Sequence, residues 1–419
     1  MGVKKVLGLL LMFPLLCASW AQAAEIHGRS STQLIWYEND LLNNGIHNGN
    51  ETSVELAEYL RLGITNIDKA GKFSIYGYGR GSQDFTSGQG LNGRLYYLYG
   101  DLRDLFDNRL DLRIGRQWVN YAAGSAIIDG FLADVKNLGP VPLVFTVMGG
   151  HDVRFSLDGE FGNITDTAMG AGVALALKDP PKFFRNTQAE FSWFRRMHQD
   201  EIIRDVLGGT LTQYLLNNLK LYGNARYDLV TESFNEVQGG IKYYPLSNLV
   251  FTGEYYESFP AFDTTSIYSV FAVDQYQEAV FRVDYTFNDI FTVHGGYTRE
   301  WFGEGATANV YLAGVGVHPV APLQLNVEFD QRTGYYGSIT GVLVDALFDI
   351  NKQFQLAAGF NWDVYQRQES TGEEIARQYW FGGKAKLAKN MAVSARLQDD
   401  VNIRYESNWS GRVVLDYDF

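Results

Sequence analysis

The sequence predicts an all-β protein: a transmembrane, antiparallel, up-and-down β-barrel of about 22 strands. Three observations lead to this fold class. Segments of alternating apolar and polar residues recur along the chain, and they are long enough to cross a membrane. Every proline after the N-terminal segment falls between these segments and none falls inside one. The chain also opens with an export signal. No later segment approaches the roughly 18 consecutive apolar residues that a transmembrane helix needs.

The N-terminal segment has the composition of a cleaved signal peptide. Lys4 and Lys5 give it a positive start, an apolar run follows over residues 6–16, and Ala21-Gln22-Ala23 forms a small-x-small cleavage site. The apolar run is too short to span a bilayer as a helix. We therefore expect two parts, a signal over residues 1–23 and a single barrel domain over residues 24–419.

Charge and cysteine content exclude several classes of protein. The signal holds two of the 35 basic residues and none of the 48 acidic ones, so its removal takes the net charge from −13 to −15. An acidic chain with scattered bases does not resemble a nucleic-acid binder. The only cysteine, Cys17, lies in the signal, which leaves the mature chain without disulfides or thiolate ligands. The six histidines show no metal-ligand spacing. We expect no metal and no other cofactor.

The alternating segments have the period of two that is typical of strands with one apolar and one polar face. In the segment 53–65, leucines alternate with charged and polar residues, and the pattern recurs at 110–115, 219–228 and 354–362. These segments run for about ten to thirteen residues, whereas strands of soluble proteins usually run for about five or six. A tilted transmembrane strand needs about nine to eleven residues, so their length favours a membrane protein.

The connections between these segments alternate between short and longer ones. Bacterial barrels have short periplasmic turns and longer outer loops, and this assigns the two sides. Counting along the chain gives 22 strands, from near Ile26 to Phe419. The stretches 119–137 and 200–218 alternate least regularly, which leaves 18 or 20 strands as alternatives. Proline cannot donate to a ladder, and its confinement to the connections agrees with this division.

The last residues, W-S-G-R-V-V-L-D-Y-D-F, form one more alternating segment. Trp409, Val413, Leu415, Tyr417 and Phe419 share one face, while Arg412, Asp416 and Asp418 share the other. A terminal aromatic residue with Tyr two positions before it resembles the insertion signal that the outer-membrane barrel assembly machinery reads. This resemblance implies that Tyr417 and Phe419 act as the assembly signal.

A second resemblance is to porins. R-L-D-L-R-I-G-R-Q, residues 109–117, is similar to a strand of many outer-membrane porins, including the alginate-export type, and L-Y-G-N-A-R-Y-D-L is also porin-like. These motifs cover about a tenth of the chain. The sequence resembles the bacterial outer-membrane β-barrel porin superfamily, without assignment to a particular family. The resemblance implies a location in the outer membrane, among lipid and lipopolysaccharide.

The period of two also sorts the charged strand residues. A charge on the lipid face would cost about 2–4 kcal/mol near the midplane, so strand charges are expected to face the lumen. They form a solvated wall or a basic ladder that guides anions. The candidate pore-lining residues are Arg29, Arg61, Arg80, Arg113, Arg226, Arg282, Glu55, Asp111, Glu190, Asp228 and Asp284.

One predicted outer loop, residues 258–275, is unusually apolar. Exposed apolar patches usually bind something or fold inward. We interpret this segment as a candidate constriction loop that folds into the lumen, with Phe262, Tyr268 and Phe271 at the narrowest point. Packing against a partner or a neighbouring subunit is the alternative interpretation. Monomer and trimer both remain open.

The sequence predicts a porin: a water-filled channel for small hydrophilic solutes or ions. An enzyme is not expected, because no histidine has a serine two residues away, as the outer-membrane phospholipases require. Two alternatives remain. The barrel could be the sheath of an electron conduit that holds a multihaem cytochrome partner, or an export channel fed by a periplasmic complex.

Overall fold

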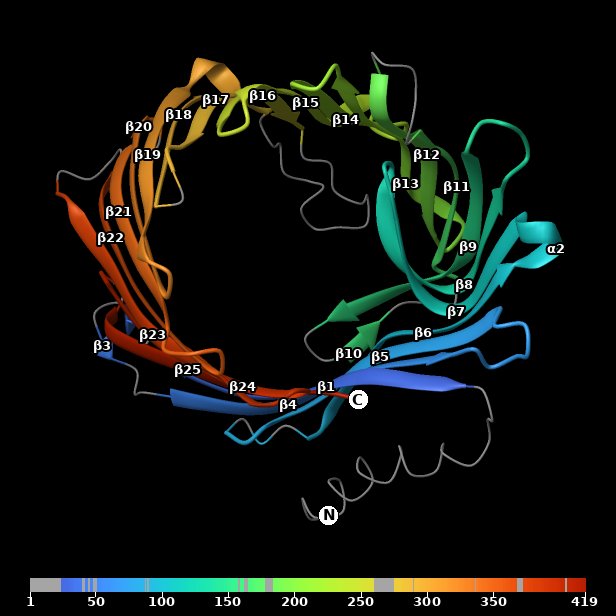
Figure 1. Ribbon diagram of the computed structural model, residues 1–419, viewed down its shortest axis with the longest axis horizontal. Coiled ribbons are helices and arrows are strands. Elements are labelled where there is room, and N and C mark those ends of the chain that lie inside the picture. Colours follow the sequence, from blue (N-terminus) through green and yellow to red (C-terminus); the bar gives the residue numbers. More distant parts are fainter. Residues whose placement is uncertain are drawn as a thin grey trace.

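The structure, a computed structural model, is a closed antiparallel β-barrel (Figure 1). It describes residues 24–39, 42–43, 46–47, 51–86, 88, 90–156, 159–161, 165–177, 184–259, 275–288, 290–335, 337–367, 372–403 and 405–419. Each barrel strand pairs with the next along the chain, and the first pairs with the last, which closes 22 strands into a ring. The predicted fold class and strand number are confirmed. No helix among these described residues is long and apolar enough to cross a membrane.

The barrel strands are β1 (Glu25–Asn39), β4 (Glu51–Thr65), β5 (Phe73–Asp84), β6 (Asn92–Asp104), β7 (Leu110–Tyr121), β8 (Gly124–Lys136), β9 (Leu143–Ser156), β11 (Thr167–Leu177), β12 (Phe184–His198), β13 (Glu201–Leu215), β14 (Leu219–Asp228), β15 (Ser233–Leu246), β16 (Leu249–Ser258), β17 (Tyr276–Thr286), β18 (Phe291–Trp301), β19 (Thr307–Val320), β20 (Leu323–Gly334), β21 (Gly337–Asp349), β22 (Phe354–Arg367), β23 (Glu374–Ala388), β24 (Met391–Asn402) and β25 (Tyr405–Asp418). The connections contain the short strands β2 (Leu42–Asn43), β3 (Ile46–His47) and β10 (Gly159–Phe161), and the short helices α2 (Leu105–Asn108) and η2 (Gly303–Gly305).

The two ends of the barrel differ in their connections. The start of β1 and the end of β25 lie at one end, where turns such as that between β4 and β5 are compact. In this turn Asp68 accepts hydrogen bonds from the backbone N–H groups of Phe73 and Lys72, both at 2.7 Å, and these bonds lower the pKa of its carboxyl. The longest connections, 40–50 and 259–275, are at the opposite end, as the sequence predicts. Tight turns also occur there, for example between β12 and β13.

The closing pair of strands fixes which side chains face the lumen. Arg29 of β1 lies opposite Asp418 of β25, and their side chains point inward with Asp416. The alternate positions of β25, including Tyr417, face outward. The rings of Tyr417 and Phe419 stack on this face at 6.0 Å. The Phe419 backbone exchanges two hydrogen bonds with Gly28, at 2.8 and 3.0 Å. The role of Tyr417 and Phe419 as an assembly signal stays a prediction.

Not every strand charge faces inward: Arg195 and Asp205 pair with each other on the outer face near the end of their strands, and Glu58 faces outward at mid-strand. Glu58 is the central residue of β4 and shares the outer face with Leu56 and Leu60. Its two carboxylate oxygens accept hydrogen bonds from Ser30 and Thr32 of β1, both at 2.5 Å. These hydroxyls supply hydrogen bonds that water would otherwise donate to the carboxylate, so the carboxylate is tolerated at mid-strand.

We expect opposite effects from removing the charge and from removing its donors. Glu58→Gln should stabilise the barrel by about 1 kcal/mol, because a charge is lost from the lipid face. Ser30→Ala with Thr32→Ala should destabilise it by about 1–3 kcal/mol, because the carboxylate loses both donors. Urea unfolding in lipid vesicles measures both effects, and Thr340→Ala, another outer-face hydroxyl, is the control. Destabilisation by Glu58→Gln would contradict this account.

Candidate functional site

A hairpin made by the ends of β7 and β8 leaves the barrel wall and folds into the lumen. Strand β7 pairs with β6 only from Leu112 to Arg116, whereas its pairing with β8 continues to the tip, where Tyr121 lies opposite Gly124. Figure 1 shows this turquoise hairpin curving away from the ring of strands into its interior. We call residues 116–129 the lumen hairpin.

Glycines explain where the bend lies. Gly115 lies opposite Gly130 on β8, and Gly130 lies opposite Gly150 on β9. Gly115 has a φ of +127°, which disfavours any residue with a side chain. A Cβ on Gly130 or Gly150 would meet the facing backbone of β9 or β8. This line of glycines across three strands therefore permits both the close approach and the sharp bend.

Apolar packing fixes the lumen hairpin against the inner wall. Val119, Ala123, Ala126 and Ile128 are at most 4% exposed and pack with buried side chains of the wall. The wall contributes Met148 of β9, Ala168 of β11, Phe194 of β12 and Val206 of β13. Fully burying a side chain such as Val, Ile or Phe contributes about 1.5–3 kcal/mol, so this cluster is a substantial anchor.

The wall makes room for the hairpin by using small residues. The inward positions of β11 are Ala168, Gly170, Gly172 and Ala174, which follow from the register with β12. A Cβ on Gly208 of β13 would collide with the backbone of the hairpin tip. These positions form a shallow inner surface on which a second layer of backbone can lie.

Polar contacts hold the tip of the lumen hairpin at its turn. The N–H of Ala122 donates to Glu190 at 2.6 Å, and the N–H of Ala123 donates to the hydroxyl of Ser192 at 2.9 Å. The guanidinium of Arg226 donates to the carbonyl of Ala122 at 2.8 Å. These three side chains of the wall supply hydrogen-bond partners for backbone groups of the buried tip.

Removing these contacts should loosen the tip. In the double variant Glu190→Ala with Ser192→Ala, we expect the amide protons of Ala122 and Ala123 to exchange about fivefold faster, because each loses a hydrogen bond of about 1 kcal/mol. Hydrogen exchange measured on the folded barrel tests this. Ser394→Ala, a lumen serine far from the tip, is the control. Unchanged exchange would show that the apolar cluster alone positions the tip.

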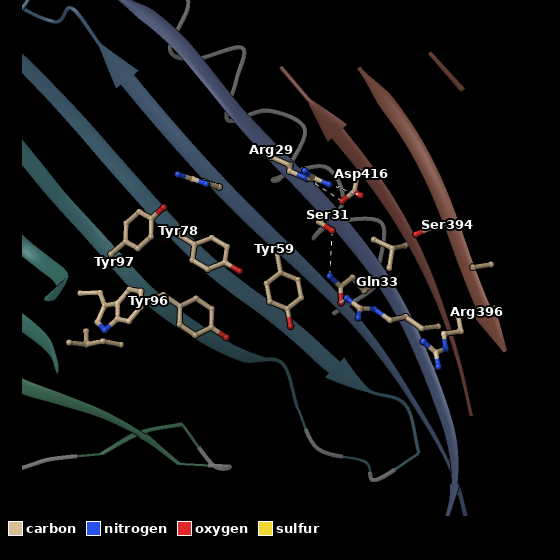
Figure 2. A pocket seen from close by; sticks show the side chains of 16 residues that line it. Arg29, Ser31, Gln33, Tyr59, Tyr78, Tyr96, Tyr97, Ser394, Arg396 and Asp416 are labelled. Atoms are coloured by element: carbon tan, nitrogen blue, oxygen red, sulfur yellow. Dashed lines mark hydrogen bonds and ion pairs between the residues drawn. The ribbon is translucent and has the colours of Figure 1, made fainter. Parts of the chain in front are cut away.

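A pocket of about 1180 Å³ lies between the lumen hairpin and the wall that runs from β24 through β25 and β1 to β6. Trp118 and Ile127 line it from the hairpin, on the face opposite to the buried cluster. Figure 2 shows four tyrosines on one side of this pocket and Arg29, Gln33 and Arg396 toward the other. The wall residues that line it are Arg29, Ser31, Gln33, Tyr59, Arg61, Tyr78, Tyr96, Tyr97, Ser394, Ala395, Arg396, Arg412, Val414 and Asp416.

Five of the predicted pore-lining residues lie in or near this pocket. Arg29 and Arg61 line it, and Arg29 forms an ion pair with Asp416 at 2.7 Å. Arg80 forms an ion pair with Glu55 and lies over the ring of Tyr59 at 5.6 Å. Arg113 does not line the pocket but lies on the nearby strand β7, where its guanidinium is 3.7 Å from the carboxylate of Asp101.

The other predicted pore-lining residues lie away from this pocket. Glu190 and Arg226 meet at the hairpin tip, and Arg226 also pairs with Glu236 at 3.0 Å. Arg282 pairs with Asp284 at 2.8 Å on the inner face of β17. Asp111 pairs with Lys136 at 2.8 Å near the termini. Asp228 is 4% exposed and accepts hydrogen bonds from the N–H groups of the turn that follows it. The candidate constriction residues Phe262, Tyr268 and Phe271 lie outside the described residues.

Sequence reasoning missed the aromatic part of the site. Tyr78 stacks on Tyr59 at 6.4 Å and on Tyr96 at 5.0 Å, and it also contacts Tyr97 at 5.6 Å. A signal was present, because tyrosines recur at alternate positions of β5 and β6. Trp118 carried no such signal, since its inward position depends on the bend at Gly115.

The inner face across the lumen is more acidic. Between β18 and β22 it carries Glu300, Glu328, Asp330, Asp345 and Asp363. Glu300 pairs with Arg332 at 3.0 Å, and Glu328 contacts His294 at 3.0 Å. We call the wall from β24 to β6, which carries Arg29, Arg61, Arg396 and Arg412, the basic wall, and the wall between β18 and β22 the acidic wall. The two walls face each other, and their opposite charges create an electric field across the lumen.

These features define the class: a 22-stranded transmembrane β-barrel with a polar lumen and an inward hairpin. No family model and no curated protein matches the sequence. Solved structures do match it. The ferric enterobactin receptor PfeA of Pseudomonas aeruginosa has a TM-score of 0.57 at 9% identity, over 93% of this chain and 81% of that one. The translocation pore of the P pilus usher PapC has a TM-score of 0.52 at 10% identity, over 94% and 99%. A BenF-like porin of Pseudomonas fluorescens Pf-5 has a TM-score of 0.48 at 7% identity, over 96% and 100%. At these identities the likeness concerns the fold alone.

Proposed function

We propose that this protein is a channel of the bacterial outer membrane, through which small hydrophilic solutes or ions diffuse. The observation that carries the proposal is the pocket of about 1180 Å³ beside the lumen hairpin, lined by arginine, serine, glutamine and tyrosine side chains. The hairpin narrows the lumen from one side and leaves this polar space on the other. A polar interior is typical of barrels that conduct water and solutes.

Two further observations support a channel. The fold is shared with the PapC usher, whose barrel is described as a translocation pore. The basic and acidic walls would orient charged or dipolar solutes as they pass the hairpin. The proposal also includes a cleaved signal over residues 1–23, insertion by the barrel assembly machinery, and contact with outer-membrane lipid and lipopolysaccharide. In this proposal the barrel carries no catalytic group and no cofactor.

Reconstitution of the purified barrel in planar bilayers tests the proposal. We expect discrete conductance steps in potassium chloride, together with a reversal potential in a salt gradient that reports the preferred ion. Absence of conductance in pure, folded protein would contradict it. Co-purification of a haem-containing protein would favour a sheath around a multihaem cytochrome. Co-purification of a periplasmic complex with conductance only in its presence would favour an export channel.

A further inference from the structure

Like charges lie directly opposite each other along the basic wall. Arg29 of β1 faces Arg61 of β4, and Arg396 of β24 faces Arg412 of β25. Like charges at opposed positions of neighbouring strands are destabilising. Both pairs line the same pocket, which makes the repulsion a property of one site.

Only part of this charge is neutralised within the protein. Arg29 is paired with Asp416 at 2.7 Å. Arg412 donates to Gln33 at 2.8 Å and Arg396 donates to Gln398 at 3.0 Å, and both acceptors are neutral. Within the described residues, Arg61, Arg396 and Arg412 have no acidic partner, and all three are exposed to the lumen. Three guanidinium groups around one cavity favour an anion with planar oxygens, such as a carboxylate.

The other side of the pocket is aromatic. Tyr59, Tyr78 and Tyr96 form a stack in which successive rings are inclined by only 25° and 26°. Trp118 lines the same pocket from the lumen hairpin and is 63% exposed, so much of its indole is free to contact a solute. Near-parallel rings beside an exposed indole favour a flat aromatic group.

We propose that this pocket is a binding site for aromatic carboxylates, in which Arg61, Arg396 and Arg412 bind the carboxylate and Trp118 with the tyrosine stack binds the ring. The inference rests on the proposed channel function and deepens it, because it names the solute class that the constriction selects. The two halves of the site come from different elements. The cationic half belongs to the barrel wall, and Trp118 is in place only because the hairpin bends inward.

Calorimetry on the whole barrel in detergent tests the site with phenylacetate as the probe. We expect saturable binding of phenylacetate, much weaker binding of acetate, which lacks the ring, and none of phenethylammonium, which has the opposite charge. Glucuronate, a carboxylate on a sugar ring, should bind more weakly than phenylacetate. Equal binding of glucuronate and phenylacetate, or of acetate and phenylacetate, would overturn the assignment of the aromatic half.

Variants separate the two halves of the site. Trp118→Ala should weaken phenylacetate binding roughly fivefold, because one ring contact is lost. Arg61→Gln with Arg412→Gln should weaken it at least about tenfold, because two charge-assisted hydrogen bonds are lost. Lys220→Gln with Lys242→Gln is the matched control, since these two lysines face each other on the neighbouring strands β14 and β15 and do not line the pocket. Equal losses in the control and in the arginine variant would mean that only the net charge of the lumen matters.

The binding measurement is independent of conduction. A barrel that binds phenylacetate but carries no current in potassium chloride would keep the site and contradict the channel. A barrel that conducts, binds no phenylacetate and shows no interruption of its current by it would keep the channel and contradict the site.

Discussion

Replacing residues 117–128 by the two-residue turn Asn-Gly should raise single-channel conductance roughly twofold or more, because the narrowest part of a pore sets its conductance. The new turn joins Arg116 and Asp129, which already lie opposite each other and form an ion pair at 2.7 Å. Asn-Gly suits a two-residue hairpin, so the shortened strands should still close the wall. Conductance in planar bilayers is the measurement.

A second deletion provides the comparison. Removing residues 260–272 should also raise conductance if the apolar loop that contains Phe262, Tyr268 and Phe271 narrows the lumen. An unchanged conductance after this second deletion would contradict the constriction loop and leave the lumen hairpin as the main obstruction. An unchanged conductance after removal of the lumen hairpin would contradict the constriction that we describe.

The second large effect concerns a single glycine of the wall. Gly208→Val should displace the hairpin tip, because a side chain at this position collides with the backbone of Ala122 and Ala123. We expect a less stable barrel, by about 1–3 kcal/mol, and a higher and noisier conductance. Urea unfolding in vesicles and bilayer recording measure the two effects.

Gly209→Val is the matched control. Gly209 is the next residue of β13 and faces outward, where an added Cβ would lie 3.7 Å from its nearest neighbour, the carbonyl oxygen of Glu190. This change adds the same side chain to the same strand without touching the hairpin. Equal effects of the two substitutions would show that β13 tolerates no valine here, and they would not support the contact with the tip.

Much of the barrel could be predicted because strand phase is local. The alternation in β4, β14, β22 and β25 depends only on neighbouring residues, and the pairing of β1 with β25 confirms that these strands close a ring. The exception at mid-strand is informative. Glu58 faces outward because Ser30 and Thr32 satisfy it from the next strand, and no local pattern reveals such a partner.

The constriction could not be predicted because it depends on register between distant segments. Gly115, Gly130 and Gly150 look unremarkable in the sequence, and they form a line only once β7, β8 and β9 are paired. The hairpin itself combines Trp118 on one face with Val119 and Ile128 on the other. One face of the hairpin packs on the inner wall and the other lines the lumen, so neither face contacts lipid. This explains why apolar and polar residues alternate only weakly over 119–137.

Cross-linking of the hairpin tip to the wall tests the central claim most directly. Residues 24–419 contain no cysteine, so Ala123→Cys with Ser192→Cys introduces a single pair in this part of the chain, at positions now joined by a hydrogen bond of 2.9 Å. Ala123 and Ser192 are buried against each other, at 0% and 1% exposed, so mild oxidation of the membranes should join this pair directly as a disulfide within one molecule. Ala123→Cys with Gly341→Cys, across the lumen on β21, should remain unlinked. Failure of the first pair to form a disulfide, with both cysteines shown to be present and reduced beforehand, would contradict a hairpin folded against the inner wall.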